Sequence, residues 1–156
     1  MIGESSFCKS LVAGHYILEA KEDWAQWCMA PIYDDDGKLH VFNSRIPGGL
    51  GGWASTSTIG HFVADQPAGP YEFVETTFSS DMATYHNPQI SKVDDTYVMV
   101  FLWKSSSTPT INQEVGIATA TSLYGPWKES PHNPVIRASF IPGSANAIHA
   151  SNPTFL

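Results

Sequence analysis

An all-β fold built from repeated four-stranded units is predicted for this chain, on three observations. Ile59-Gly60 recurs as Val115-Gly116, and the same offset of 56 residues carries Gly69-Pro70 onto Gly125-Pro126. Short alternating runs lie between these landmarks, separated by turn residues, which indicates antiparallel strands. No sequence stretch of about ten residues or more has the apolar spacing of an amphipathic helix. Such a repeat is typical of stacked β units such as propeller blades.

The first unit is expected between residues 24 and 80, after a weakly patterned leading segment of residues 1–23. Asp34-Asp35-Asp36-Gly37 is expected to be a turn, because Asp-Gly accepts positive φ at low cost. Pro47–Gly52 is expected to be a flexible loop. Four antiparallel strands in about 50 residues make one blade. The strands are placed at Met29–Tyr33, Lys38–Ser44, Thr56–Ala64 and Tyr71–Thr76.

The second unit is expected between residues 81 and 140, and the start of a third between residues 141 and 156, where Asn152-Pro153 repeats Asn87-Pro88. The strands of the second unit are placed at Gln89–Val93, Thr96–Trp103, Val115–Thr121 and Trp127–Glu129. A closed propeller needs about four blades or more. Three alternatives follow: the chain is a piece of a longer protein, the gene ends early, or copies complete one another. Two copies of about two and a half blades would make five, which predicts a homodimer.

Charge and composition narrow the function classes. The net charge is −7, from 15 acidic and 8 basic residues, so a nucleic-acid partner is not expected. No apolar run approaches the roughly 18 residues of a membrane span, and no intact signal peptide is read, so localisation stays open. Cys8 and Cys28 are interpreted as free or buried thiols. The aromatic share of 12% favours sheets and sugar-stacking surfaces equally.

Several phrases of the sequence point to a known family. They are Met29–Ile32 with Asp36–Arg45, Gly69–Glu75, His86–Pro88 with Asp95–Val98 and, most specific, Val115–Trp127. Together they resemble the five-bladed β-propeller glycoside hydrolases of families 43 and 117, from about Trp24 onward. The resemblance implies an active site at the mouth of a central channel, lined by the first strand of each blade. It also implies carboxylates as general acid, general base and pKa modulator, and a central divalent cation such as calcium in many members.

The function expected from this resemblance is hydrolysis of glycosidic bonds in a polysaccharide or oligosaccharide, with carbohydrate as the partner. Two alternatives stay open. One is a non-catalytic carbohydrate-binding propeller module, and the other is an incomplete assembly piece without sugar activity. The first gains support from Ala30, which precedes Pro31 where family 43 usually has its catalytic Asp.

The candidate catalytic residues are Asp81, Asp23 and His86. Asp81 shortly precedes His86-Asn87-Pro88, and Asp23 holds nearly the same place before Met29-Ala30-Pro31. Each is a candidate carboxylate, and the alternative is an Asp that fixes the loop before a strand. His86 is expected to bind a sugar hydroxyl or a cation, or to act as an acid. The alternative for His86 is a structural histidine.

Asn87, Asn152 and His149 are candidate substrate-binding residues. Asn87 and Asn152 each precede proline, and they are expected to offer hydrogen-bonding groups to the channel. The alternative is that Asn before Pro only supports the extended start of a strand. His149 lies three residues before Asn152, and it is a weaker candidate for the same role as His86.

The remaining binding candidates are tryptophans and an arginine. Trp27, Trp53 and Trp24 are expected to stack on sugar faces, or else to pack inside blades. Arg45 is expected to grip a carboxylate or a sugar hydroxyl, or else to form a salt bridge between blades. No metal-ligand motif is present: Asp34–Gly37 lacks the ligand spacing of a helix-loop-helix calcium site.

Overall fold

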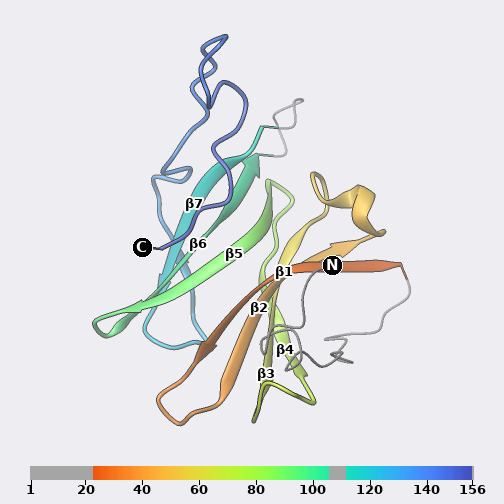
Figure 1. Cartoon of the computed structure of the whole chain (residues 1–156), viewed down its shortest axis with the longest axis vertical. Coiled ribbons are helices and arrows are strands. Elements are labelled where there is room, and N and C mark those ends of the chain that lie inside the picture. The colour runs from red at the N-terminus through yellow and green to blue at the C-terminus, as the bar shows by residue number, and fades with distance from the viewer. Residues whose placement is uncertain (1–22, 106–111, 156) are drawn as a thin grey trace, which may run out of the picture.

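The computed structural model describes residues 23–105 and 112–155, which form two four-stranded antiparallel sheets (Figure 1). In each sheet the strands follow one another in sequence order. The first sheet holds β1 (Trp24–Tyr33), β2 (Leu39–Pro47), β3 (Thr58–Ala64) and β4 (Glu72–Phe78). The second holds β5 (Ala83–Val93), β6 (Thr96–Ser105), β7 (Glu114–Ala120) and β8 (Lys128–Glu129). The predicted all-β fold of blade-like units is confirmed.

The first strand of each sheet is longer than expected. β1 begins at Trp24 rather than Met29, and β5 begins at Ala83 rather than Gln89. Both strands change register part way, between Trp27 and Met29 and between His86 and Gln89. A bulge breaks the alternation of side chains, so the sequence pattern reveals only the half of each strand after it. The expected loop Pro47–Gly52 also contains a short 3₁₀ helix, η1 (Leu50–Gly52).

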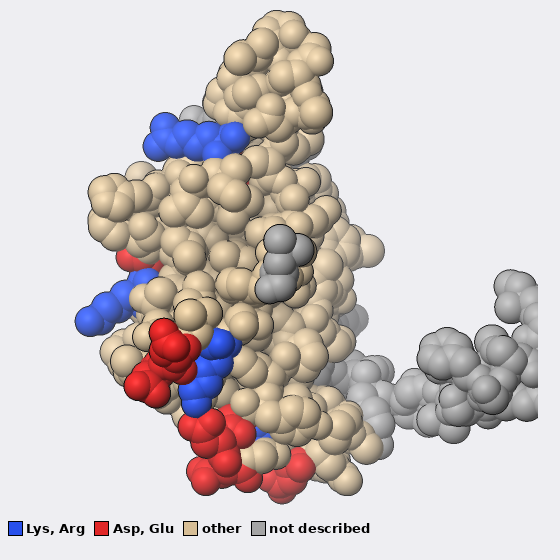
Figure 2. All heavy atoms as spheres, turned by 60° about the vertical axis from the view of Figure 1, so that its left-hand side comes forward, with Lys and Arg blue, Asp and Glu red and all other residues tan. Residues whose placement is uncertain are grey.

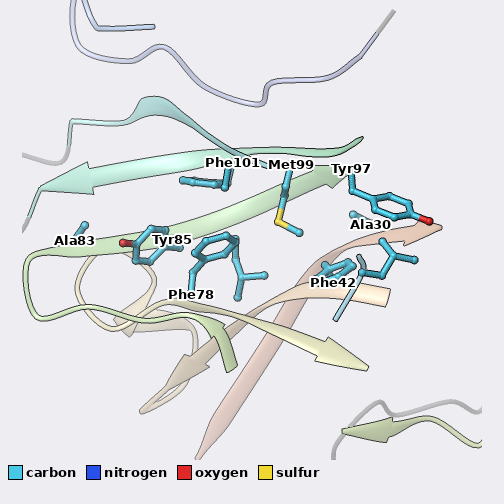
Figure 3. Close-up of a cluster of buried hydrophobic side chains, with 11 residues drawn as sticks. Ala30, Phe42, Phe78, Ala83, Tyr85, Tyr97, Met99 and Phe101 are labelled. Atoms are coloured by element: carbon cyan, nitrogen blue, oxygen red, sulfur yellow. The ribbon is translucent and has the colours of Figure 1, made fainter. Parts of the chain in front are cut away.

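An aromatic core joins the two sheets, and it is drawn in Figure 3. Phe101 is fully buried, and its ring centroid lies 5.2 Å from that of Phe78 and 5.5 Å from that of Tyr85. Phe42 in the first sheet packs edge to face against Trp127, which immediately precedes β8 of the second, with ring centroids 5.7 Å apart. Burying each such ring stabilises the fold by about 1.5–3 kcal/mol. The blades are thus held together chiefly by apolar contact.

Glycine is required where β7 passes this core. A Cβ on Gly116 would lie 2.4 Å from the Phe101 ring, closer than packed atoms approach. We expect Gly116→Ala to reduce the free energy of unfolding by about 1–3 kcal/mol, because the ring must shift. Urea unfolding followed by tryptophan fluorescence measures it. Gly51→Ala is the matched control, since its Cβ would meet nothing within 4 Å; equal effects of the two substitutions would contradict the prediction.

The β1–β2 turn begins a buried chain of polar groups. Asp34 Oδ1 accepts hydrogen bonds from the backbone N–H groups of Asp36 and Lys38, as expected for turn chemistry. Asp34 Oδ2 lies 3.3 Å from His40 Nε2, and His40 Nδ1 lies 2.8 Å from His61 Nε2. Both histidines are fully buried. Burial lowers the pKa of His61 to about 4, helped by its closeness to His40.

The described surface carries its charges unevenly. Figure 2 shows one face on which acidic side chains gather at the lower end while most of the rest is uncharged. An ion pair between Lys92 and Asp35, 2.8 Å long, connects β5 to the turn of the first sheet. Such an exposed pair contributes little to stability. No helix in the described part of the chain is long and apolar enough to cross a membrane.

Candidate functional site

The bulges in β1 and β5 are equivalent positions of the repeat. Trp27 pairs with Ser44 immediately before the first bulge, and His86 pairs with Leu102 immediately before the second. The next residue has positive φ in both strands, 53° at Cys28 and 47° at Asn87. Asn152 has the same conformation, with φ of 54°. Cys28 and Asn87 therefore occupy equivalent bulge positions, and Asn152, which lies outside the strands, shares their backbone angle.

The structure changes which residue of the first unit is equivalent to Asn87. The sequence placed Ala30 opposite Asn87, because each precedes a proline. In the structure Ala30 pairs with Phe42 after the bulge and is buried, whereas Cys28 holds the conformation of Asn87. The proline match is off by two residues because the bulge residues are outside the alternating pattern. Cys28 is an exposed residue with a free thiol, and partial burial of the sulfur raises the pKa of this thiol; Cys8 lies outside the described residues.

Cys28, Asn87 and Asn152 line one hollow of about 250 Å³, here called the bulge hollow after the bulges at Cys28 and Asn87. Asn87 Nδ2 donates a hydrogen bond of 2.8 Å to Asn152 Oδ1, and Asn87 N–H donates to Ser44 Oγ at 2.9 Å. Asn87 Oδ1 is buried without a hydrogen-bond partner among the described residues. The described lining contains no carboxylate and consists of Cys28, Asn87, Gln89, Asn152, Pro153 and Thr154.

His86 precedes Asn87 in the chain, lies outside the lining of this hollow, and has an aromatic setting. Trp27 Nε1 lies 3.0 Å from His86 Nε2 and 3.3 Å from Nδ1, and Ser57 Oγ lies 3.2 Å from Nδ1. The Trp53 ring centroid is 5.9 Å from that of His86. Burial lowers the pKa of His86 to about 4, so the ring is neutral near pH 7. Both ring nitrogens of His86 have contacts, so His86 is better suited to hold neighbouring side chains in place than to donate a proton to a substrate.

A second, larger cavity of about 550 Å³ opens between the segment before β3 and the β4–β5 connection. We call it the hydroxyl pocket, since serine and threonine dominate its lining. Asp81, an exposed carboxylate, is one of its walls, and Ser57 joins it to His86. Its lining consists of Ser55, Thr56, Ser57, Thr58, Ser79, Ser80, Asp81, Ala83 and Thr84.

Asp23, Arg45 and His149 lie outside the linings of both cavities. Asp23 is exposed immediately before β1. Arg45 is buried, and its guanidinium carbon lies 4.4 Å from the ring centroid of Trp24 and 4.3 Å from that of Phe73. His149 is exposed, and its Nδ1 accepts a long hydrogen bond of 3.4 Å from Gln113 N–H. The geometry therefore gives two groups, the Trp27 and Trp53 rings around His86 and the Asn87–Asn152 pair in the bulge hollow, with Asp81 in the hydroxyl pocket.

Sequence reasoning missed Ser44 and Ser57, which hold Asn87 and His86 in place. Ser44 lies in β2 and Ser57 immediately before β3, and each bonds a residue of the second sheet, so only the packing of the blades reveals them. A metal centre is not supported: residues 23–105 and 112–155 contain no group of three His, Cys, Asp or Glu side chains that could hold an ion. We therefore derive no step through a central cation.

No family model matches the sequence, and no curated protein matches it. Solved structures do match the fold. A family 117 glycoside hydrolase of the marine bacterium Zobellia galactanivorans has a TM-score of 0.63 at 12% identity, over 85% of this chain and 45% of that one. A thermostable family 43 glycoside hydrolase has a TM-score of 0.55 at 18% identity, over 77% and 41%.

A family 43 enzyme of Xanthomonas citri, complexed with xylotriose, has a TM-score of 0.57 at 13% identity, over 72% of this chain and 33% of that one. The chain thus spans less than half the length of these neighbours, which are β-propellers. At such identities the likeness shows the fold alone. The described chain has the fold of part of a β-propeller of glycoside hydrolase type.

Proposed function

We propose that this chain supplies sugar-binding blades of a glycoside hydrolase-like propeller, which acts on glycosidic bonds of an oligosaccharide or polysaccharide. The bulge hollow carries the proposal. Cys28 and Asn87, from the two bulges, meet Asn152 there, and two of these three side chains are amides. The resemblance in sequence and the fold of the neighbours support the same conclusion.

The chemistry of the hollow suits a sugar. Asn87 Oδ1 is a buried acceptor without a hydrogen-bond partner among the described residues, and a sugar hydroxyl would satisfy it once the side chain turns toward the hollow. Outside this lining, the Trp27 and Trp53 rings contact His86, which precedes Asn87 in the chain. An apolar ring next to amide groups is the usual setting for a sugar, which presents both hydroxyls and C–H faces.

Hydrolysis requires two carboxyl groups, one that protonates the leaving oxygen and one that activates water or attacks. The described lining of the bulge hollow has none. Asp81 is the carboxylate that we propose for catalysis from this chain, with His86 and Asn87 orienting the sugar. The partner carboxylate then comes from blades that complete the propeller, in a second copy or in further chain. Light scattering behind a sizing column distinguishes a homodimer from a monomer.

Non-catalytic carbohydrate binding is the second candidate function. Cys28 favours it, because the slot matched to Asn87 holds a thiol that stays protonated near pH 7. This alternative predicts saturable binding of oligosaccharide without release of product. An assembly piece without sugar activity would show neither.

The experiment screens arabino-, xylo- and galacto-oligosaccharides for binding by calorimetry and for product by chromatography. We expect Asn87→Ala to weaken binding about three- to tenfold, the worth of one or two hydrogen bonds. Asp81→Asn should abolish product release if the chain is hydrolytic. Asn146→Ala, an exposed asparagine away from the hollow, is the control. Unchanged binding in Asn87→Ala would overturn the assignment of the hollow.

A further inference from the structure

We propose that Ser44 is a positioning residue of the bulge hollow. Its hydroxyl, supplied by the first sheet, holds Asn87 of the second sheet in the left-handed backbone conformation from which the Asn87 amide reaches Asn152. The inference deepens the proposed function and rests on it for any effect on sugar binding, whereas the conformation itself is testable without a sugar. It is carried by the hydrogen bonding of the β5 bulge and by the contacts that the first sheet makes there.

The bulge of β5 contains a backbone N–H group that points at Ser44. In the β5–β6 pairing two residues, Asn87 and Pro88, lie opposite the single residue Phe101. Proline has no N–H group, so Asn87 carries the one backbone donor of this pair. A bulge disrupts the ladder locally, and a buried N–H needs an acceptor. Ser44 Oγ accepts the hydrogen bond from Asn87 N–H at 2.9 Å.

This hydrogen bond fixes the direction of the Asn87 side chain. Asn87 has a φ of 47°, a left-handed value that asparagine tolerates but does not prefer to the extended region. The angle φ is the rotation that relates the N–H group to the side chain on the same residue. An N–H held by Ser44 at this φ therefore sets where the side chain points, and there Asn87 Nδ2 donates to Asn152 Oδ1 at 2.8 Å.

Ser44 is placed for this role by the first bulge. It lies on β2 and pairs with Trp27 of β1, immediately before the register shift of that strand. The Trp27 ring in turn packs against His86, with centroids 4.8 Å apart. One pair of facing residues in the first sheet thus contacts two consecutive residues of β5, Trp27 with His86 and Ser44 with Asn87. The bulge conformation of the second sheet consequently depends on the docking of the first.

The burial of Ser44 separates a positioning role from direct contact with a ligand. Ser44 is fully buried, and it lies outside the described lining of the bulge hollow. A sugar in the hollow would therefore contact Asn87 and not Ser44. Any effect of Ser44 on binding should then pass through Asn87, which a double-mutant cycle can measure.

The first test reads the backbone conformation in the full chain by NMR, without a ligand. A left-handed residue brings its own amide and α hydrogens closer together than an extended residue does, so a strong intraresidue nuclear Overhauser effect marks it. We expect this signal at Asn87 in the unaltered protein and its loss in Ser44→Ala. The Asn87 side-chain amide hydrogens should also exchange faster with solvent in Ser44→Ala, because the bond to Asn152 weakens.

Ser57→Ala is the matched control for the first test. It removes another buried hydroxyl that reaches the second sheet, but one that contacts His86. Both signals of Asn87 should survive this substitution. Ser44→Cys, in which the sulfur is only a weak acceptor, should give an intermediate effect and stands in should Ser44→Ala fold poorly. Retention of both signals in Ser44→Ala and Ser44→Cys, or their equal loss in Ser57→Ala, would overturn the inference.

The second test measures the link to sugar binding by calorimetry. The probe is whichever arabino-, xylo- or galacto-oligosaccharide binds most tightly in the screen of the proposed function. We expect Ser44→Ala to weaken its binding about three- to tenfold. In an Asn87→Ala background the same substitution should change the affinity less than about twofold, because the residue through which Ser44 acts is already truncated.

The outcomes distinguish this inference from the proposed function. An equal loss from Ser44→Ala in both backgrounds would show that Ser44 supports the packing of the blades in general, and would overturn its positioning role. Unchanged binding in Ser44→Ala, with Asn87→Ala still weakening it, overturns the role and leaves the assignment of the bulge hollow intact. If none of the oligosaccharides binds, the proposed function fails, and the NMR signals of Asn87 alone decide the role of Ser44.

Discussion

Lowering the pH from 7 to 4 is expected to destabilise this fold by several kcal/mol. Burial depresses the pKa of His61 and of His86 to about 4 in the folded protein, while an unfolded histidine has its ordinary pKa of 6.5. Between pH 6.5 and 4 these two histidines are protonated in the unfolded chain but stay neutral in the folded protein. The stabilising contribution is therefore complete above pH 6.5 and is lost as the pH falls toward 4. Each residue accounts for about 2–3 kcal/mol.

Urea unfolding at a series of pH values, followed by tryptophan fluorescence, measures this dependence. His61→Gln keeps a polar side chain of similar size but cannot titrate. Its free energy of unfolding should therefore fall less with decreasing pH, by the share of about 2–3 kcal/mol ascribed to His61. The difference between the two profiles cancels every group that they have in common. Identical slopes would show that protonation of His61 is not linked to unfolding, and a flat profile for the unaltered protein would refute the prediction as a whole.

Replacing Phe101 by alanine should lower the free energy of unfolding by about 3–5 kcal/mol. The side chain is fully buried and contacts the Phe78 and Tyr85 rings, one from each sheet. Its removal leaves a cavity that rigid neighbouring strands cannot close. Because that cavity lies at the contact of the two blades, it weakens their docking as well as the second blade itself.

Chemical denaturation at pH 7 gives the value for Phe101→Ala. Phe140→Ala deletes the same side chain where it is 59% exposed, and should change stability by less than about 0.5 kcal/mol. A similar small effect at Phe101 would mean that the two sheets do not share one core in solution.

The sequence predicted the repeat and all eight strands because turn residues and alternation are local signals. Asp34–Gly37 and the two Gly-Pro turns bound the strands whatever the rest of the chain does. The first halves of β1 and β5 were missed because a bulge changes which face each side chain occupies. One extra residue is enough to end an alternating pattern.

The candidate site could be predicted only in part. Asn87, Asn152 and His86 stand out because proline and the repeat mark them. Ser44 and Ser57 do not, since their partners are far away in sequence and meet them only when the blades pack. The slot of Cys28 was also missed, because its mark is a backbone dihedral angle and not a residue type.

The left-handed backbone at Cys28, Asn87 and Asn152 disfavours most amino acids at these positions. Asparagine, aspartate and glycine tolerate such φ values, while most other residues are strained by them. Two of these three carry short polar side chains, the amides and carboxylates from which sugar sites are made. The conformation thus favours side chains with short amide or carboxylate groups at these positions. One substitution between asparagine and aspartate converts a binding group into an acid without disturbing the blade.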